Sequence, residues 1–241
     1  MPRSNPGRGR ATPIRSGRGE SPRGAPPRRL GRPARLSRGS ILEAAVARLD
    51  RAPHEPLTVA RIAQEVGAVP AALYRHFASV DDLLDGVLGR VLGGVELEIR
   101  NRARWPAQLR DWMKSLRRHL LRYPAALSLL GRRGRTSPAW LDVVAVQIGI
   151  LRRAGLRGAQ LARAHLWVTE TAIGIVMQEA SLSLPDQIRG ARASLSEMSE
   201  AGRPFLAPLI ASLATLDADA FFEFVVERTI AALVDLVERG E

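Results

Sequence analysis

Apolar residues recur every three or four positions along most of the chain after residue 35. This spacing places the apolar side chains of a segment on one side of a helix, whereas a half-buried strand shows strict alternation. No strand pattern emerges, so we predict an all-α protein. The predicted helices cover residues 36–49, two short stretches within 58–77, and then 79–99, 106–122, 138–154, 160–181, 205–216 and 218–238.

The pattern is weaker between these helices. We expect a basic connection at 101–105, a short apolar turn up to residue 130, and a polar loop at 131–137. Residues 182–204 show little periodicity, so a loop with one helical turn is expected there. Four glycines between residues 86 and 94 interrupt an otherwise helical pattern. They fit close packing, a bend or hinge, or substitutions that the packing tolerates.

The segment from Thr58 to Phe77 has the pattern of two short helices joined by a tight turn. The Thr58 hydroxyl is suited to cap the first helix, and Gly67 follows its last apolar position, where a left-handed residue lets the chain turn. Pro70 suits the first turn of the second helix because its missing N–H needs no partner there. A small residue at Ala63 lets the helices cross closely, so the segment is predicted to be a helix-turn-helix.

The outer positions of this segment are the candidates for contact with DNA. Leu73 and Phe77 are four residues apart and give the second helix its inner face. The remaining positions lie outside or at the leading end, where a helix-turn-helix meets the major groove. The predicted DNA-binding residues are Thr58, Val59, Val69, Pro70, Ala71, Tyr74, Arg75 and His76.

Residues 57–84, which read L-T-V-A-R-I-A-Q-E-V-G-A-V-P-A-A-L-Y-R-H-F-A-S-V-D-D-L-L, resemble the DNA-binding motif of TetR-family transcriptional regulators. The strong similarity extends over residues 36–92. The resemblance implies a DNA-binding domain at 36–100 and a helical effector-binding and dimerisation domain at 101–241. It also implies that Tyr74 and His76 approach DNA phosphates. Two positions depart from the family pattern: Ala72 replaces a hydroxyl residue and Val80 replaces a lysine, and both positions commonly touch phosphates in the family.

The positive charge of the chain is concentrated at its start. The 241 residues carry 36 basic and 24 acidic side chains, a net charge of +12. The segment Met1–Arg38 holds eleven arginines and one acid, Glu20, so it carries +10 and leaves +2 for the rest. Residues 1–35 are rich in Arg, Gly and Pro, and we predict that they are disordered. Two roles stay open: an arm that contacts phosphates or the minor groove, or an inert extension, which includes a start codon placed too far upstream.

No feature of the sequence indicates export or catalysis. Arg28 and Arg29 precede no apolar stretch, and no apolar run is long enough to span a bilayer, so we expect a cytoplasmic protein. There are no cysteines, and the four histidines lack the spacing of a metal site. Because no nucleophile motif or phosphate-binding loop occurs either, we predict no enzyme activity, no metal and no cofactor.

The resemblance further implies an effector cavity within 101–241. Polar side chains among bulky apolar ones suit such a cavity, although tryptophan and methionine at helical spacing also suit a plain core. The candidate ligand-binding residues are Trp112, Leu116, His119, Trp140, Gln147, His165 and Thr169. In the tetracycline repressor a histidine binds the drug-chelated magnesium, and the matching residue here is Leu129. A tetracycline–magnesium effector is therefore not expected.

The helix at 160–181 and the final helix match the dimerisation bundle of the family. A two-fold dimer presents two recognition helices to one face of double-stranded DNA and reads a near-palindromic operator. We therefore predict a homodimeric repressor that an unknown small apolar inducer releases, by a shift between conformations. The alternative is a helical small-molecule-binding or interaction protein with weakened or lost DNA binding, which the changes at Ala72 and Val80 would favour.

Overall fold

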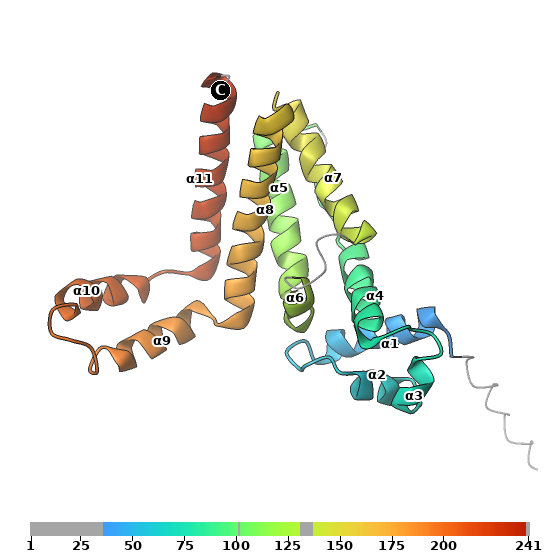
Figure 1. Ribbon diagram of the computed structural model, residues 1–241. Coiled ribbons are helices and arrows are strands. Elements are labelled where there is room, and N and C mark those ends of the chain that lie inside the picture. The colour runs from blue at the N-terminus through green and yellow to red at the C-terminus, as the bar shows by residue number, and fades with distance from the viewer. Residues whose placement is uncertain (1–35, 101, 131–136, 240–241) are drawn as a thin grey trace, which may run out of the picture. The chain divides into compact units, whose positions relative to one another are not determined.

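The computed structural model describes residues 36–100, 102–130 and 137–239, and every regular element in these ranges is a helix (Figure 1). The predicted all-α class is confirmed, while the prediction of disorder at 1–35 and most of the loop predicted at 131–137 lie outside the described residues. The helices are α1 (Arg38–Arg51), α2 (Val59–Glu65), α3 (Pro70–Leu73), α4 (Val80–Gly93), α5 (Trp105–Leu121), α6 (Pro124–Leu130), α7 (Pro138–Arg153), α8 (Gly158–Ser181), α9 (Leu184–Ser194), α10 (Arg203–Leu213) and α11 (Ala218–Arg239).

Short polar side chains fix the starts of the first helices. The Ser37 hydroxyl accepts a hydrogen bond from the Ser40 amide and begins α1. Thr58 caps α2 by accepting from the Arg61 amide at 3.3 Å, and Ser79 caps α4 in the same way. Gly67 has a φ of 64°, so the left-handed turn predicted after α2 is present. These caps satisfy amide groups that a helix start otherwise leaves without partners.

The buried side chains form two clusters. The first lies among α1, α2, α3 and α4 around Ile41, Ile62 and Leu73. Tyr123, directly before α6, and Ala126, in its first turn, complete this cluster. The second lies among α5, α7, α8 and α11 around Trp112 and Phe222. Helix α4 contributes side chains to both clusters: Leu83, Val87 and Val91, each four residues apart, belong to the first, and Leu88 and Leu92 belong to the second.

The helix predicted at 79–99 ends earlier than expected. Helix α4 ends at Gly93, and Gly94 follows as its C-terminal cap. Two consecutive glycines have the weakest helix propensity short of proline, which outweighs the apolar periodicity that continues to Ile99. Residues 95–100 and 102–104, the described part of the connection to α5, form no helix, and the Glu98 amide donates a hydrogen bond to the Ser115 hydroxyl at 3.2 Å.

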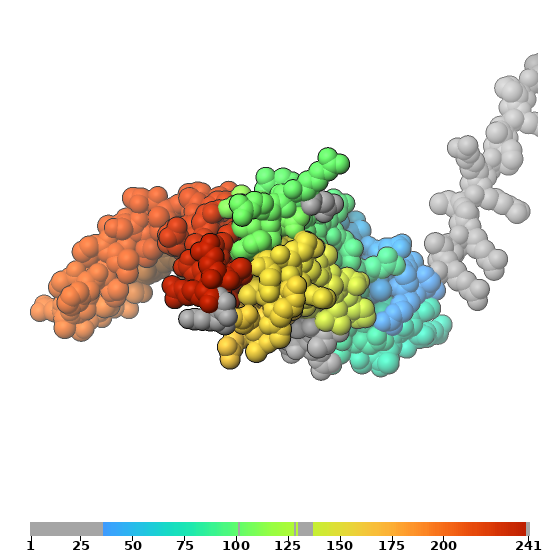
Figure 2. Space-filling model, turned by 90° about the horizontal axis from the view of Figure 1, so that it is seen from above, coloured from blue at the N-terminus to red at the C-terminus, as the bar shows by residue number. Residues whose placement is uncertain are grey.

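The prediction of a loop at 182–204 was wrong, because this stretch contains the eleven-residue helix α9. Ser183 caps this helix and a proline occupies its first turn, a start signal that the weak periodicity obscured. The predicted turn before residue 130 is likewise a helix, α6. Helices α9 and α10 pack chiefly against each other, and Figures 1 and 2 show them projecting from α8 and α11.

Candidate nucleic-acid interface and effector core

The predicted DNA-binding residues lie at the starts of α2 and α3 and directly after α3. Thr58 caps α2, and Val59 is its first residue. Val69 caps α3 and is 66% exposed, and Tyr74 ends α3 and is 48% exposed. The side chains of Pro70, Ala71 and Arg75 are also exposed, whereas that of His76 is half-buried. Ala72 is half-buried and Val80 is exposed. Because both side chains are apolar, neither offers a polar group to a phosphate.

The second helix of the motif is shorter than predicted. Regular α-helix is limited to Pro70–Leu73, and the chain continues in turns to Phe77. The amides of His76 and Phe77 both donate to the Leu73 carbonyl, at 2.9 Å and 3.1 Å. The backbone therefore still winds in the same direction, and Phe77 still reaches the core with 2% exposure.

Arg38 holds the end of this segment in place. Its guanidinium donates to the His76 carbonyl at 3.1 Å and to both oxygens of Asp82, at 3.0 Å and 2.7 Å. It also lies over the Phe77 ring, 4.4 Å from its centroid. The Arg38 hydrogen bonds, together with the Ala78 amide at 2.9 Å, lower the pKa of Asp82 to about 2. This role cannot be read from the sequence, because Arg38 and Asp82 are far apart in the chain and Arg38 directly follows the basic segment at 1–35.

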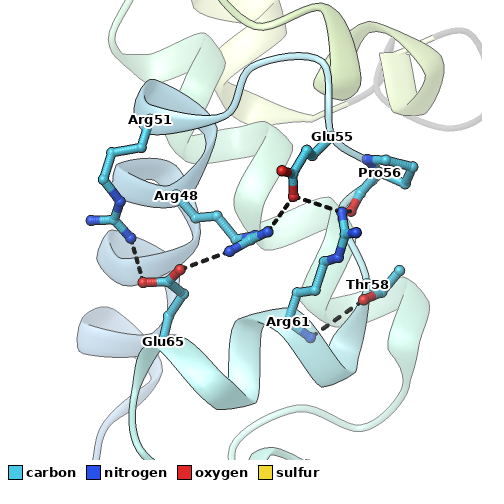
Figure 3. Close-up of polar contacts among 7 residues, drawn as sticks. All are labelled: Arg48, Arg51, Glu55, Pro56, Thr58, Arg61 and Glu65. Atoms are coloured by element: carbon cyan, nitrogen blue, oxygen red, sulfur yellow. Dashed lines mark hydrogen bonds and ion pairs between the residues drawn. The ribbon is translucent and has the colours of Figure 1, made fainter.

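A network of ion pairs joins α1, the following loop and α2 (Figure 3). Glu65 accepts hydrogen bonds from Arg48, at 2.9 Å, and from Arg51. Glu55 in the loop pairs with Arg48 at 2.5 Å and with Arg61 at 2.9 Å. The hydrogen bonds from Arg51 and Arg48 lower the pKa of Glu65. The network fixes the position of α2 relative to α1, and it occupies three arginines of the unit.

As a result, the folded helix-turn-helix unit has little free positive charge. Residues 36–94 contain six arginines and seven carboxylates, a net charge of −1. Five of the six arginines have a carboxylate partner, the weakest being Arg90 with Glu43 at 3.7 Å. Within the described part of the chain, Arg75 directly after α3 is the arginine of this unit without an ion pair.

The structure brings together three of the candidate ligand-binding residues. His165 Nδ1 lies 2.7 Å from Gln147 Oε1, and the Thr169 hydroxyl donates to the same oxygen at 3.4 Å. Since Gln147 Oε1 only accepts, His165 Nδ1 carries the proton in this arrangement. Burial lowers the pKa of His165, so its neutral form is favoured. This polar cluster joins α7 to α8.

The other candidates divide between the core and a different place. Trp112, Leu116 and Trp140 are buried in the core cluster, and the Trp112 indole donates to the Val143 carbonyl at 3.0 Å. His119 lies apart from them, where its Nε2 is 2.7 Å from the Val91 carbonyl near the end of α4. Burial lowers the pKa of His119.

The cavities described next do not include Gln147, His165 or Thr169 in their lining. An apolar one of about 350 Å³ is lined by residues of α8, α9, α10 and α11, including Ile175, Leu184, Leu213 and Phe221. A polar one of about 290 Å³ lies between α1, α4 and α5 and includes His119 in its lining. In the residues that the structure describes, no helix is long and apolar enough to cross a membrane, and no three acidic or histidine side chains gather as metal ligands would.

Comparison with known proteins gives consistent matches. The sequence model described as "Bacterial regulatory proteins, tetR family" matches residues 41–87, and the one described as "Tetracyclin repressor-like, C-terminal domain" matches residues 100–236. An HTH-type transcriptional regulator of Saccharopolyspora erythraea is 32% identical over 175 residues, which are 71% of this chain and 74% of the relative. The HTH-type transcriptional repressor DrrR1 of Streptomyces coeruleorubidus is 29% identical over 226 residues, 86% of this chain and 81% of the relative.

A solved structure with the same fold is that of ActR from Streptomyces coelicolor. Its apo form is 27% identical and superposes with a TM-score of 0.70, over 86% of this chain and 99% of that one. ActR has also been solved in complex with actinorhodin, at 26% identity and the same TM-score, over 85% of this chain and 99% of that one.

Proposed function

The chain belongs to the TetR family of bacterial transcriptional regulators, and we propose that it is a homodimeric repressor that a small apolar inducer releases from its operator. The relative DrrR1 is named a repressor and ActR binds a small molecule, which supports both parts of the proposal. In such a regulator an inducer lowers DNA affinity by as much as it favours the conformation that does not fit the operator.

The exposed face of the helix-turn-helix carries the proposal. Between residues 36 and 94 the large apolar side chains that are exposed are Val69, Tyr74 and Val80. All three lie between the start of α3 and the start of α4, and the neighbouring Arg75 has no carboxylate partner in the described residues. Uncovered apolar groups beside a free guanidinium suit a surface that contacts DNA sugars, phosphates and base edges.

The test is a double substitution on this face. Tyr74→Ala with His76→Ala is expected to weaken binding to the DNA that flanks the protein's own gene by about 10- to 100-fold, because each contact contributes about 1 kcal/mol or more. Binding is measured by fluorescence anisotropy. The control Leu141→Ala removes a side chain that is 54% exposed on α7 and should leave affinity unchanged. Helical content should stay the same in both variants. Unchanged affinity in the double variant would favour the alternative function, a ligand-binding protein without DNA binding.

The N-terminal arginines are proposed to supply the charge that the folded unit lacks. Residues 1–35 hold ten arginines and one acid and carry +9, whereas residues 36–94 carry −1. Each phosphate neutralised adds about −0.9 to the slope of log K against log salt. We therefore expect full-length protein to show a slope steeper by roughly 2–5 per subunit than protein beginning at Leu36, on operator and random DNA alike. Equal slopes would show that the tail does not take part.

The dimer face is proposed on α8 and α11, and it extends onto α9 and α10. Leu166 and Trp167 of α8 and Phe221 and Phe224 of α11 are between 43% and 59% exposed. The apolar cavity lined by α8, α9, α10 and α11 makes this surface continuous with the exposed apolar side chains of α10. A second copy of the chain is the occupant that fits, because a two-fold dimer also sets two α3 helices against a near-palindromic operator.

The inducer site is proposed around Gln147, His165 and Thr169. Gln147 and Thr169 are buried, and the three side chains bond to one another, so a ligand can exchange its own polar groups for theirs. Actinorhodin, the molecule bound by ActR, is a suitable first probe. It should raise the melting temperature of the protein, and the rise should survive EDTA and shrink in Gln147→Leu. A rise that depends on added magnesium would contradict the proposed metal-free site.

A further inference from the structure

The polar cavity lies where the helix-turn-helix unit meets the core helices. Val46 of α1, Val91 of α4, and Ser115 and His119 of α5 belong to its lining. The cavity has a volume of about 290 Å³. A molecule held there touches both the DNA-binding helices and the core, so it can affect how they pack together.

One wall of the cavity is aromatic and apolar. The rings of His119 and Tyr123 lie with their centroids 5.3 Å apart and their planes tilted by 53°. Val46 and Val91 extend this wall. Such a surface favours a flat aromatic ring, which gains both burial and ring–ring contact.

The rim of the cavity carries three guanidinium groups. Arg90, Arg118 and Arg122 belong to the lining, with 52%, 58% and 64% of their side chains exposed. Glu96 and Glu98 also belong to the lining, so the charge around the cavity is mixed. Guanidinium groups bind carboxylates with two parallel hydrogen bonds.

The present partners of these arginines are easily replaced. Arg118 pairs with Glu98 at 3.0 Å, Arg122 with Asp50 at 2.8 Å, and Arg90 approaches Glu43 at 3.7 Å. All three arginines are more than half exposed, and exposed ion pairs contribute little net stability. A ligand carboxylate can therefore take the place of a protein carboxylate at small cost.

The cavity also adjoins a direct link between α4 and α5. His119 Nε2 lies 2.7 Å from the Val91 carbonyl, so this nitrogen carries the proton and donates it. A Cβ at Gly94 would lie 3.5 Å from His119 Cε1, which shows how closely the chain after α4 approaches the ring. The end of α4 is thereby tied to α5 at the edge of the cavity.

We propose that this cavity is a second ligand site, specific for a small aromatic carboxylate, which braces the end of α4 against α5. The ring packs against Tyr123 and the valines, and the carboxylate meets the guanidinium groups at the rim. A volume of about 290 Å³ suits a molecule with one ring rather than a large polycyclic one. Binding at this site does not depend on the proposed function, and only its regulatory role rests on it.

Benzoate, benzamide and benzamidine form a matched set of probes, with the same ring and a negative, neutral or positive group. Isothermal titration of the full-length protein, at an ionic strength matched with sodium chloride, should give benzoate a Kd of about 1 mM or tighter. Benzamide should bind at least about tenfold more weakly, and benzamidine weaker still, because neither can accept two hydrogen bonds from a guanidinium. Benzamidine binding as tightly as benzoate would overturn the proposal.

Substitution locates the binding. Arg90→Gln with Arg118→Gln should weaken benzoate binding at least about tenfold, because it removes two of the three cations while their exposed partners stay solvated. The matched control is Arg152→Gln, an exposed arginine on α7 that does not line the cavity, and it should change nothing. A double variant that folds normally and binds benzoate as the natural protein does would also overturn the proposal.

The regulatory role has its own test. By linkage, operator DNA should change the Kd of benzoate at least about threefold if DNA binding favours a different packing of α4 on α5. An unchanged Kd would remove the regulatory role and leave the site. Failure of benzoate to bind would remove the site and leave the outcome of Tyr74→Ala with His76→Ala untouched, so the two proposals fail separately.

Discussion

The helix-turn-helix unit and the arm formed by α9 and α10 are both small helical assemblies, but their apolar side chains are placed in opposite ways. Ile41, Leu49, Ile62 and Leu73 of the first unit are each at most 1% exposed. In the arm, α9 buries Ile188 and α10 buries Ile210, while Phe205 is 79% exposed. The first unit thus covers its own core, and the arm does not.

Exposed apolar residues therefore have a different explanation in each region. In the helix-turn-helix unit the core is complete, so the exposed Val69 and Tyr74 are surplus to folding and indicate contact with a partner such as DNA. In the arm, each helix buries only one apolar side chain, and Phe205, Leu206 and Leu209 are exposed. Their exposure fits the proposed dimer, in which another copy of the chain would cover them.

The largest effect should come from opening the complete core. Phe77→Ala removes a ring that is 2% exposed and lies under the Arg38 guanidinium. It should lower the free energy of unfolding by about 3–5 kcal/mol, measured by urea denaturation. Leu141→Ala, which removes a side chain 54% exposed on α7, should change it by less than about 0.5 kcal/mol. Similar losses in both variants would contradict the view that the helix-turn-helix unit holds its own core.

The next largest effect should appear in assembly rather than in folding. Phe205→Glu with Leu209→Glu places charges on residues of α10 that are 79% and 50% exposed. The dimer dissociation constant should rise at least about tenfold, since charges in an apolar interface are strongly unfavourable. Analytical ultracentrifugation measures it, with Leu141→Glu as a control for added charge. A dissociation constant that stays the same would mean that the arm remains uncovered in solution.

The two regions also differ in how far the sequence predicted them. Apolar periodicity, the cap at Thr58 and the turn at Gly67 predicted the helix-turn-helix together, because each is a local signal and all agree. Helix α9 was missed because it buries a single apolar residue, Ile188, so it has no periodicity to detect. Its start signal at Ser183 was present, but a cap alone does not outweigh a missing apolar face.

Within the sites, contacts between side chains that are far apart in the sequence could not be predicted. The set Gln147, His165 and Thr169 was proposed from residue type, and the helices do bring these three together. The attachment of Arg38 to Asp82, and of His119 to the end of α4, joins segments that are far apart in the sequence. Charge counts along the sequence do not reveal which cations already have partners, so they could not show that five of the six arginines in residues 36–94 pair with a carboxylate.

The smallest expected effect concerns this same Arg38–Asp82 pair and appears as a dependence on pH. The pKa of Asp82 is lowered from its ordinary value of 3.8 to about 2 by the Arg38 and Ala78 hydrogen bonds. A carboxyl with a lowered pKa in the folded state stabilises that state above its unfolded pKa, and the contribution is lost as the pH falls from about 4 to about 2. Asp82→Asn should therefore unfold at a lower urea concentration than the natural protein at pH 6, and this gap should close as the pH approaches 2. Asp85→Asn removes the same charge from the same helix at an exposed position, so it controls for net charge. If the difference in urea midpoint between Asp82→Asn and the natural protein stays constant between pH 6 and pH 2, the asparagine side chain, and not the lost charge, causes it. Arg38 would then hold the segment after α3 through the His76 carbonyl alone.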